Sequence, residues 1–96
     1  MSDPIGLFMA GEEDSNRAIK VKMLFFGPLA EKMETREIEV SIMAETSLND
    51  LAKQFELVEM LSSGLRVAID GRLEANLSRL LHDAAEVAFL PPVSGG

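Results

Sequence analysis

Val87-Ala88-Phe89-Leu90-Pro91-Pro92-Val93-Ser94-Gly95-Gly96, the last ten residues, join an apolar β-strand to two prolines and four small or β-branched residues. The strand is apolar at every position, which is typical of a strand in the middle of a sheet, buried on both faces. The two prolines remove backbone donors and favour an extended chain before them. Glycine without a Cβ makes the end of the chain narrow. The segment predicts a central strand, a stiff collar (Pro91-Pro92) and a thin tail (93–96).

A strand of similar character begins the folded part of the chain. Residues 19–25 alternate between Lys and apolar side chains at first, and then become apolar on both faces. Gly27-Pro28 breaks this strand. Residues 36–42 alternate cleanly between polar and β-branched side chains, which predicts a second strand with one face in water.

The clearest helix signal follows these two strands. Ser47 with Asp50 three residues later is a variant of the capping box, and an apolar stripe follows over residues 48–55. A shorter apolar segment ends at Gly64. A third strand over 65–69 turns at Asp70-Gly71. Residues 72–81 fit either a helix or an irregular connection with a short edge strand.

The order strand, strand, helix, strand, short strand or loop, strand is typical of the α+β class. We expect a β-grasp (ubiquitin-like) fold, with a mixed sheet of four to five strands crossed by one main helix. The first and last strands then lie side by side in the middle of the sheet. This domain covers residues 19–96, and residues 1–18, rich in Gly and polar side chains, predict a disordered N-terminal arm.

Composition excludes several classes of function. The 96 residues are enough for one domain, and a net charge of −7 with nine scattered Lys and Arg disfavours nucleic acid and anionic membranes. An acidic protein suits a basic protein partner. Cysteine is absent, which removes disulfides, thiol nucleophiles and Cys-based metal sites. Neither a signal peptide nor a membrane span is evident, so we expect a cytoplasmic protein.

Candidates for an active site within the domain are weak. His82 beside Asp83 is more typical of a turn than of a catalytic pair, and Ser62-Ser63-Gly64 lacks a nucleophile elbow. The carboxylates follow no metal-loop spacing, so no metal site is expected. The remaining group is the carboxylate of Gly96. It is inert until activated, for instance as an acyl-adenylate, and can then accept sulfur or form an amide.

The chain resembles the small, sulfur-carrying subunit of molybdopterin synthase, a ubiquitin-like β-grasp family. Residues 21–27, residues 67–71 and above all Asp83 with residues 86–96 carry the resemblance, which covers about residues 19–96. It implies that an ATP-dependent activating enzyme adenylates the terminal glycine, on which sulfur is then installed as a thiocarboxylate. The tail next enters the large subunit and gives its sulfur to cyclic pyranopterin monophosphate, which makes the dithiolene that binds molybdenum.

The resemblance also implies that this chain is no enzyme on its own. The catalytic groups are expected on the large subunit, and no cofactor is expected on this chain, because the activating enzyme uses the ATP. The family usually has a glycine in the turn before the final strand, where this chain has Ala84-Ala85. The geometry of that turn is therefore open.

The predicted site consists of Gly96, the carboxylate that is adenylated and thiocarboxylated, and of the residues before it. These are predicted to bind partners: Phe89, Leu90, Pro91, Pro92, Val93, Ser94 and Gly95. Phe89 and Leu90 should lie on opposite faces of the strand, so at most one of them belongs to the core.

Three other functions fit the same fold. One is a ubiquitin-like protein modifier, joined through its C-terminal glycine to target lysines. Another is a thiamine-pathway sulfur carrier, although tails of that group generally lack Pro-Pro before the last four residues. The third is a β-grasp binding module whose tail has no role.

Overall fold

The computed structural model describes residues 17–92. Strand β1 (Ala18–Phe25) begins one residue further on, and the carbonyl of Arg17 already accepts a hydrogen bond from the N–H of Ala44, at 2.7 Å. Ala18 of the predicted arm thus belongs to the sheet, and Arg17 is hydrogen-bonded to its edge. Residues 1–16 lie outside the described residues.

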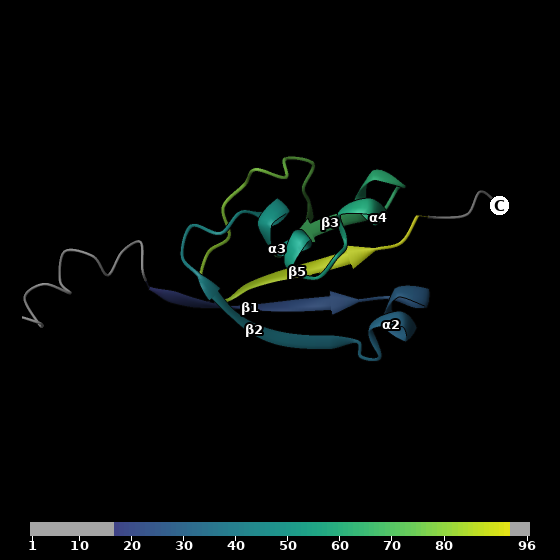
Figure 1. Ribbon diagram of the computed structural model, residues 1–96, viewed down its shortest axis with the longest axis horizontal. Helices are drawn as coiled ribbons and strands as arrows, with labels where there is room; N and C mark the ends of the chain where they lie inside the picture. Colours follow the sequence, from purple (N-terminus) through teal and green to yellow (C-terminus); the bar gives the residue numbers. More distant parts are fainter. Residues whose placement is uncertain (1–16, 93–96) are drawn as a thin grey trace, which may run out of the picture.

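Five strands form one mixed sheet in the order β2-β1-β5-β3-β4 (Figure 1). The other strands are β2 (Glu37–Met43), β3 (Arg66–Ile69), β4 (Arg72–Leu73) and β5 (Ala85–Leu90). β1 and β5 are parallel neighbours in the middle, and the remaining neighbours are antiparallel. The predicted central position of the first and last strands is confirmed.

Three short helices join the strands: α2 (Gly27–Met33), α3 (Leu48–Gln54) and α4 (Val58–Ser62). The predicted capping box starts α3: Ser47 Oγ accepts a hydrogen bond from the N–H of Asp50 at 3.1 Å, and the Asp50 carboxylate accepts one from the N–H of Ser47 at 3.4 Å. No helix in the described part of the chain is long and apolar enough to cross a membrane.

Within residues 17–92, helix α2 is the one element that the sequence does not predict. Pro28 ends β1, but it is also the second residue of α2, where its missing N–H costs no intrahelical hydrogen bond. The residue that breaks the strand is therefore compatible with a helix that starts at once.

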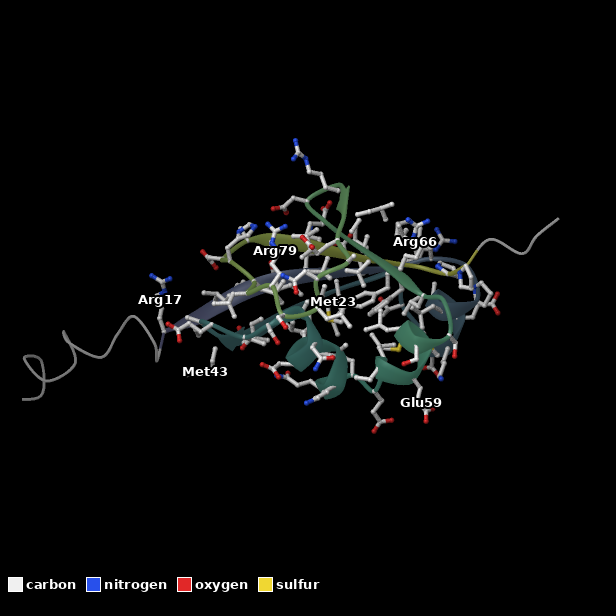
Figure 2. All side chains as sticks on the ribbon, turned by 90° about the horizontal axis from the view of Figure 1, so that it is seen from above. Arg17, Met23, Met43, Glu59, Arg66 and Arg79 are labelled. Atoms are coloured by element: carbon white, nitrogen blue, oxygen red, sulfur yellow. The ribbon has the colours of Figure 1, made fainter. Side chains whose placement is uncertain are left out.

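The core lies between one face of the sheet and helices α3 and α4. Figure 2 shows Met23 of β1 inside this layer. The rings of Phe25 and Phe89 stack across the β1–β5 pair, with 5.9 Å between their centroids and 27° between their planes. The apolar stripe of α3 is buried against this layer through Leu48, Leu51 and Ala52.

Residues 74–84 have no regular helix or strand. Asp70 and Gly71 join β3 to β4 with φ values of 52° and 85°, as in a type I′ hairpin. Beyond β4 the chain passes beside the start of α3, where Leu80 forms an isolated bridge with Ser47. Of the two predicted structures for this segment, the irregular connection with a short edge strand is the correct one.

The turn into β5 is tied to Lys20 of β1 by Asp83 and by Ala84. The N–H of Ala84 donates to the carbonyl of Lys20 at 2.7 Å, and the Asp83 carboxylate accepts from the N–H of Lys20 at 2.9 Å. These contacts hold Ala84 at a φ of 68°, which is a glycine-like conformation. The turn thus has the left-handed backbone conformation that glycine would adopt, although the residue is alanine. An alanine is strained in this left-handed conformation.

Replacing Ala84 with glycine is expected to raise the free energy of unfolding by about 0.5–1 kcal/mol, because the relief of strain exceeds the added entropy of the unfolded chain. The Tm should rise by several degrees in a domain of this size. Ala75→Gly is the matched control: Ala75 is also exposed in the connection, and its φ is not positive. A Tm of Ala84→Gly at or below that of the unchanged protein would show that the turn is unstrained.

Candidate functional site

Strand β5 leads to the base of the predicted tail. In Figure 1 it ends between α2 and α4, and Pro91 and Pro92 continue from that point. Both prolines are described, whereas the predicted site residues Val93, Ser94, Gly95 and Gly96 lie outside the described residues.

Each proline of the collar lies close to a glycine. A Cβ atom added to Gly27 would lie 3.6 Å from Cγ of Pro91, and one added to Gly64 would lie 3.4 Å from Cβ of Pro92. Gly27 is the first residue of α2, and Gly64 follows the end of α4. The collar is therefore seated between the start of one helix and the end of another, and it forms part of the wall of an apolar groove of about 370 Å³.

Phe89 and Leu90 lie on opposite faces of β5, as predicted. Phe89 is fully buried in the core against Phe25, while Leu90 is half-buried on the other face, in register with Arg66 of β3. Of the two, only Leu90 has side-chain surface that a partner can touch. Phe89 instead holds the end of β5 in the core, two residues before the collar begins.

The sheet face opposite α3 and α4 carries a patch of apolar side chains. Cross-strand register aligns Leu24, Ala88, Ala68 and Leu73 in one row over β1, β5, β3 and β4. Phe26 continues the extended backbone of β1 and so falls on the same face. We call this set the sheet-face patch: Leu24, Phe26, Ala68, Leu73, Ala88 and Leu90.

The largest side chains of this patch are well exposed. Leu73 is 55% exposed and Phe26 45%. Charged side chains lie beside the patch, among them Lys22 and Glu37, which form an ion pair at 3.6 Å. An exposed apolar patch with a polar rim is typical of a surface that binds another protein. Of this set, the sequence alone predicts only Leu90 as a contact for a partner.

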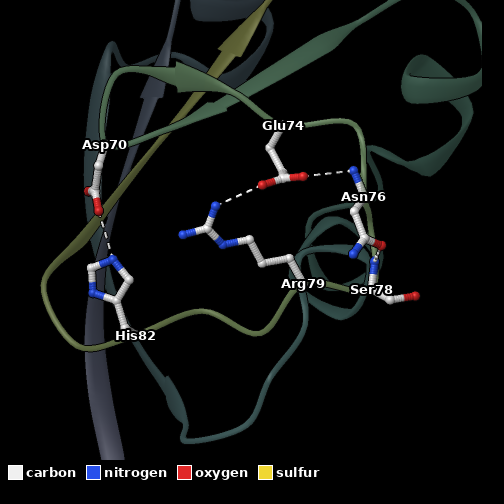
Figure 3. Close-up of polar contacts among 6 residues, drawn as sticks. All are labelled: Asp70, Glu74, Asn76, Ser78, Arg79 and His82. Atoms are coloured by element: carbon white, nitrogen blue, oxygen red, sulfur yellow. Dashed lines mark hydrogen bonds and ion pairs between the residues drawn. The ribbon is translucent and has the colours of Figure 1, made fainter.

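His82 contacts Asp70 rather than the side chain of its neighbour Asp83 (Figure 3). Its Nε2 lies 2.7 Å from Oδ2 of Asp70, and its Nδ1 lies 2.9 Å from the carbonyl oxygen of Asp83. Both ring nitrogens therefore face acceptors, which favours the doubly protonated ring. The bond to the Asp83 carbonyl, followed by the bond to Asp70, raises the pKa of His82.

The Asp70 carboxylate has a second partner, the N–H of Glu86, at 3.0 Å. This backbone hydrogen bond is the main reason why the pKa of Asp70 is lowered, with the His82 bond next. The pair thus links the β3–β4 turn to the beginning of β5, at the opposite end of that strand from the collar.

The neighbouring polar contacts organise the irregular connection (Figure 3). Arg79 donates to the Glu74 carboxylate at 2.7 Å, and the N–H of Asn76 donates to the same carboxylate at 3.0 Å. Asp83 and Ala84 form a turn, as predicted for His82-Asp83. Within residues 17–92, no group of three or more His, Asp or Glu side chains could hold a metal ion.

A mixed sheet with parallel central strands and with its main helices on one face defines the β-grasp class of ubiquitin-like proteins. The model of the ThiS family matches residues 23–96, and the chain belongs to this family. The predicted membership in a ubiquitin-like sulfur-carrier family is thereby confirmed. Curated protein sequences gave no match.

Solved structures agree with this fold. A putative molybdopterin converting factor subunit 1 from Pyrococcus furiosus has a TM-score of 0.68 at 21% identity, over 78% of this chain and 99% of that chain. The small archaeal modifier protein 1 of Methanosarcina acetivorans has a TM-score of 0.64 at 24% identity, over 84% and 100%. A chain from the complex of subunits 1 and 2 of the molybdopterin-converting factor of Helicobacter pylori 26695 has a TM-score of 0.60 at 27% identity, over 81% and 100%.

His82 is the single histidine, so its titration can be followed by NMR without ambiguity. We expect a midpoint above the usual value of 6.5. The raised pKa of His82 adds stability that is complete below pH 6.5 and is lost as the pH rises through the folded-state pKa. The lowered pKa of Asp70 adds stability above its usual value of 3.8, which is lost as the pH falls through the folded-state pKa. The pair of His82 and Asp70 therefore stabilises the fold most between pH 3.8 and pH 6.5.

Asp70→Asn should move the His82 midpoint down toward 6.5. Asp83→Asn is the control, because the Asp83 side chain binds the N–H of Lys20 and only its carbonyl contacts the ring. An unchanged midpoint in Asp70→Asn would contradict the assignment of the pair.

Proposed function

We propose that this protein is the sulfur-carrying small subunit of a molybdopterin synthase and works in the cytoplasm. The Gly96 carboxylate is adenylated by an activating enzyme that uses ATP, becomes a thiocarboxylate, and enters the large subunit, which holds the catalytic groups. This chain binds no cofactor of its own. The observation that carries the proposal is the sheet-face patch, which reaches Leu90 and is therefore continuous with the base of the tail.

The chemistry needs activation because a carboxylate is a poor electrophile. An oxygen of the Gly96 carboxylate attacks the α-phosphorus of ATP, pyrophosphate leaves, and an acyl-adenylate forms. A sulfide-level sulfur donor then attacks the acyl carbon, and AMP leaves. The thiocarboxylate sulfur then attacks a carbon of cyclic pyranopterin monophosphate and displaces the oxygen substituent of that carbon. Water hydrolyses the acyl–sulfur bond, which leaves the sulfur on the pterin and restores the carboxylate.

The residues of this chain suit that role. Cysteine is absent, so the chain has no thiol that could carry sulfur as a persulfide. Glycine at positions 95 and 96 keeps the tail narrow enough for a channel in a partner. The prolines before it cannot donate ladder hydrogen bonds, so the pairing of β5 ends at the collar.

The surface beside the tail suits a large and partly basic partner. A hollow of about 790 Å³ next to Phe26 is bordered by Glu31, Glu34 and Glu37, and also by Arg36. The whole chain has a net charge of −7, and these glutamates favour cationic side chains on the other side of an interface. The similar structure from Helicobacter pylori is a complex of subunits 1 and 2 of the molybdopterin-converting factor, which supports a partner of this kind.

A protein modifier is the alternative that fold similarity favours. Small archaeal modifier proteins and Urm1 from Trypanosoma brucei share the fold at 15–24% identity, which bears on the fold alone. A thiamine-pathway carrier is less well supported, because Pro91-Pro92 stands directly before the last four residues. The state of Gly96 in cells separates these functions.

Mass spectrometry of the intact protein from cells is expected to show the mass increase of one sulfur in place of one oxygen. Isopeptide links from Gly96 to lysines of other proteins would instead identify a modifier. A binding module with an unused tail would show neither product.

Deletion of Gly96 is expected to abolish sulfur transfer in an assay reconstituted with the activating enzyme, ATP, a sulfide donor and the large subunit. The Tm should stay unchanged, because the residue lies beyond the last strand. An extension by one alanine should have the same effect as the deletion, since it moves the carboxylate. Transfer by the deletion variant at the normal rate would refute the role of Gly96.

Leu73→Ala is expected to weaken binding to the large subunit by about 2 kcal/mol, or about 30-fold in Kd, as measured by calorimetry. The fold should be little affected, because Leu73 is 55% exposed. Leu80→Ala is the matched control: Leu80 is 54% exposed, but it bridges to Ser47 and lies outside the sheet-face patch. Equal effects of the two variants would count against the patch as the interface.

A further inference from the structure

We propose that the open edge of β3 is a docking site for an extended segment of a partner protein, in which one acidic residue stands between two apolar ones. The site is a groove of about 300 Å³ between β3 and residues 75–77 of the connection, and we call it the edge groove. Its lining includes Leu61, Leu65, Val67 and Leu77. The edge groove is separate from the tail, so its occupation does not depend on the role proposed for Gly96.

Two backbone groups of β3 point into the edge groove. The N–H of Glu74 donates to the carbonyl of Val67 at 2.8 Å, so the backbone groups of Val67 point away from β5. The N–H of Val67 has no acceptor within residues 17–92, although this residue is only 3% exposed. The carbonyl of Leu65, two residues earlier, points to the same edge, and no backbone N–H in that range donates to it. An unpaired N–H and C=O on one strand edge are the groups that bind an added strand.

The edge groove stays open because the connection is bound to α3 instead of β3. The carbonyl of Leu77 accepts a hydrogen bond from the N–H of Asn49 at 2.8 Å, in the first turn of α3, where the helix itself has no acceptor for it. The Glu74 carboxylate binds Arg79 and the N–H of Asn76, which turns the chain away directly after its last bond to β3 (Figure 3). Closing the groove by further pairing with β3 would break these hydrogen bonds.

The side chains around the edge groove predict the sequence of the segment. A residue paired opposite Arg66 has its side chain on the same face of the sheet as Arg66. Arg66 is exposed and forms no ion pair within residues 17–92, so an acidic side chain suits that position. The two flanking residues point to the other face, toward Leu61 and Leu77, where apolar side chains fit.

The edge groove also adjoins the surface already described. Leu73 lines the groove and belongs to the sheet-face patch, so one partner can cover both. A second copy of this chain is a less suitable occupant. Its β2 carries the same pattern in Ile38-Glu39-Val40, but each copy has a net charge of −7 and would repel the other.

The probe is the peptide acetyl-Thr-Ile-Glu-Val-Thr-amide, titrated into the full-length protein and followed by NMR through the backbone N–H signals. A second peptide has Lys in place of Glu. Arg66→Gln removes the cation beside the groove. Arg72→Gln is the matched control, because Arg72 is also an exposed arginine of the β3–β4 hairpin but does not line the groove. Hydrogen exchange of the Val67 amide is measured with and without the peptide.

In the free protein, the Val67 amide is expected to exchange faster than that of Ala68, whose backbone groups face β5. The Glu peptide should shift the Val67 signal and, at a concentration about nine times its Kd, slow the exchange about tenfold. The Lys peptide should bind about two- to fivefold more weakly, and Arg66→Gln should weaken binding of the Glu peptide by a similar factor. Arg72→Gln should bind the Glu peptide as the unchanged protein does.

An unchanged Val67 signal at the solubility limit of the Glu peptide would overturn the proposal. Signal changes confined to the sheet-face patch, or equal losses of affinity in Arg66→Gln and Arg72→Gln, would also contradict it. If the Val67 signal shifts with the concentration of the protein alone, the occupant is a second copy, and the assignment to a partner protein is wrong. The peptide experiment involves no sulfur transfer, so its failure leaves the proposed function untouched.

Discussion

Parallel pairing between residues 21–25 of β1 and residues 85–89 of β5 places the first and the last strand of the described chain side by side. A parallel pair cannot be joined by a tight turn, so the chain between the two strands includes a crossover from one side of the pair to the other. The crossover carries α3 and α4 onto one face, where they cover the aromatic pair Phe25–Phe89. The other face is left to the sheet-face patch, and the end of β5 sets the place at which the collar begins.

Successive side chains of β5 point to opposite faces of the sheet, so this strand contributes both to the core and to the proposed partner surface. Phe89 faces inward and belongs to the core, while Leu90, the next residue, faces the side that we assign to the partner. The strand is held from both sides, by β1 and by β3, so the tail starts from the most constrained part of the sheet. A carrier needs this combination, because a partner has to find the end of the chain at a defined place.

Side-chain periodicity in the sequence was sufficient to predict the strands and α3, since burial on one face leaves a regular apolar pattern. The capping box of Ser47 and Asp50 marked the start of α3 for the same local reason. Helix α2 was missed because Pro28 ends a strand and suits the first turn of a helix equally well. In residues 72–81, leucine spacing alone could not separate a helix from an irregular return.

The candidate site was predictable only where its residues are neighbours in the chain. Leu90 and the collar follow directly from the last strand, but Leu24, Ala68 and Leu73 join them through strand register. No local pattern encodes that register across four strands. The seat of Pro92 on Gly64 is a contact of the same kind, because the sequence showed only that glycine suits a helix end there.

The central place of β5 also decides when during synthesis the chain can fold. β1 and β3 both pair with β5, so a nascent chain that lacks residues 85–90 has no strand to join the two halves of the sheet. Such long-range pairing makes folding depend on contacts that form late. The sheet-face patch spans the same strands and is absent from an unfinished or unfolded copy. Under the proposed function, a partner that recognises the patch together with the tail would act on folded copies of the chain and not on unfolded ones.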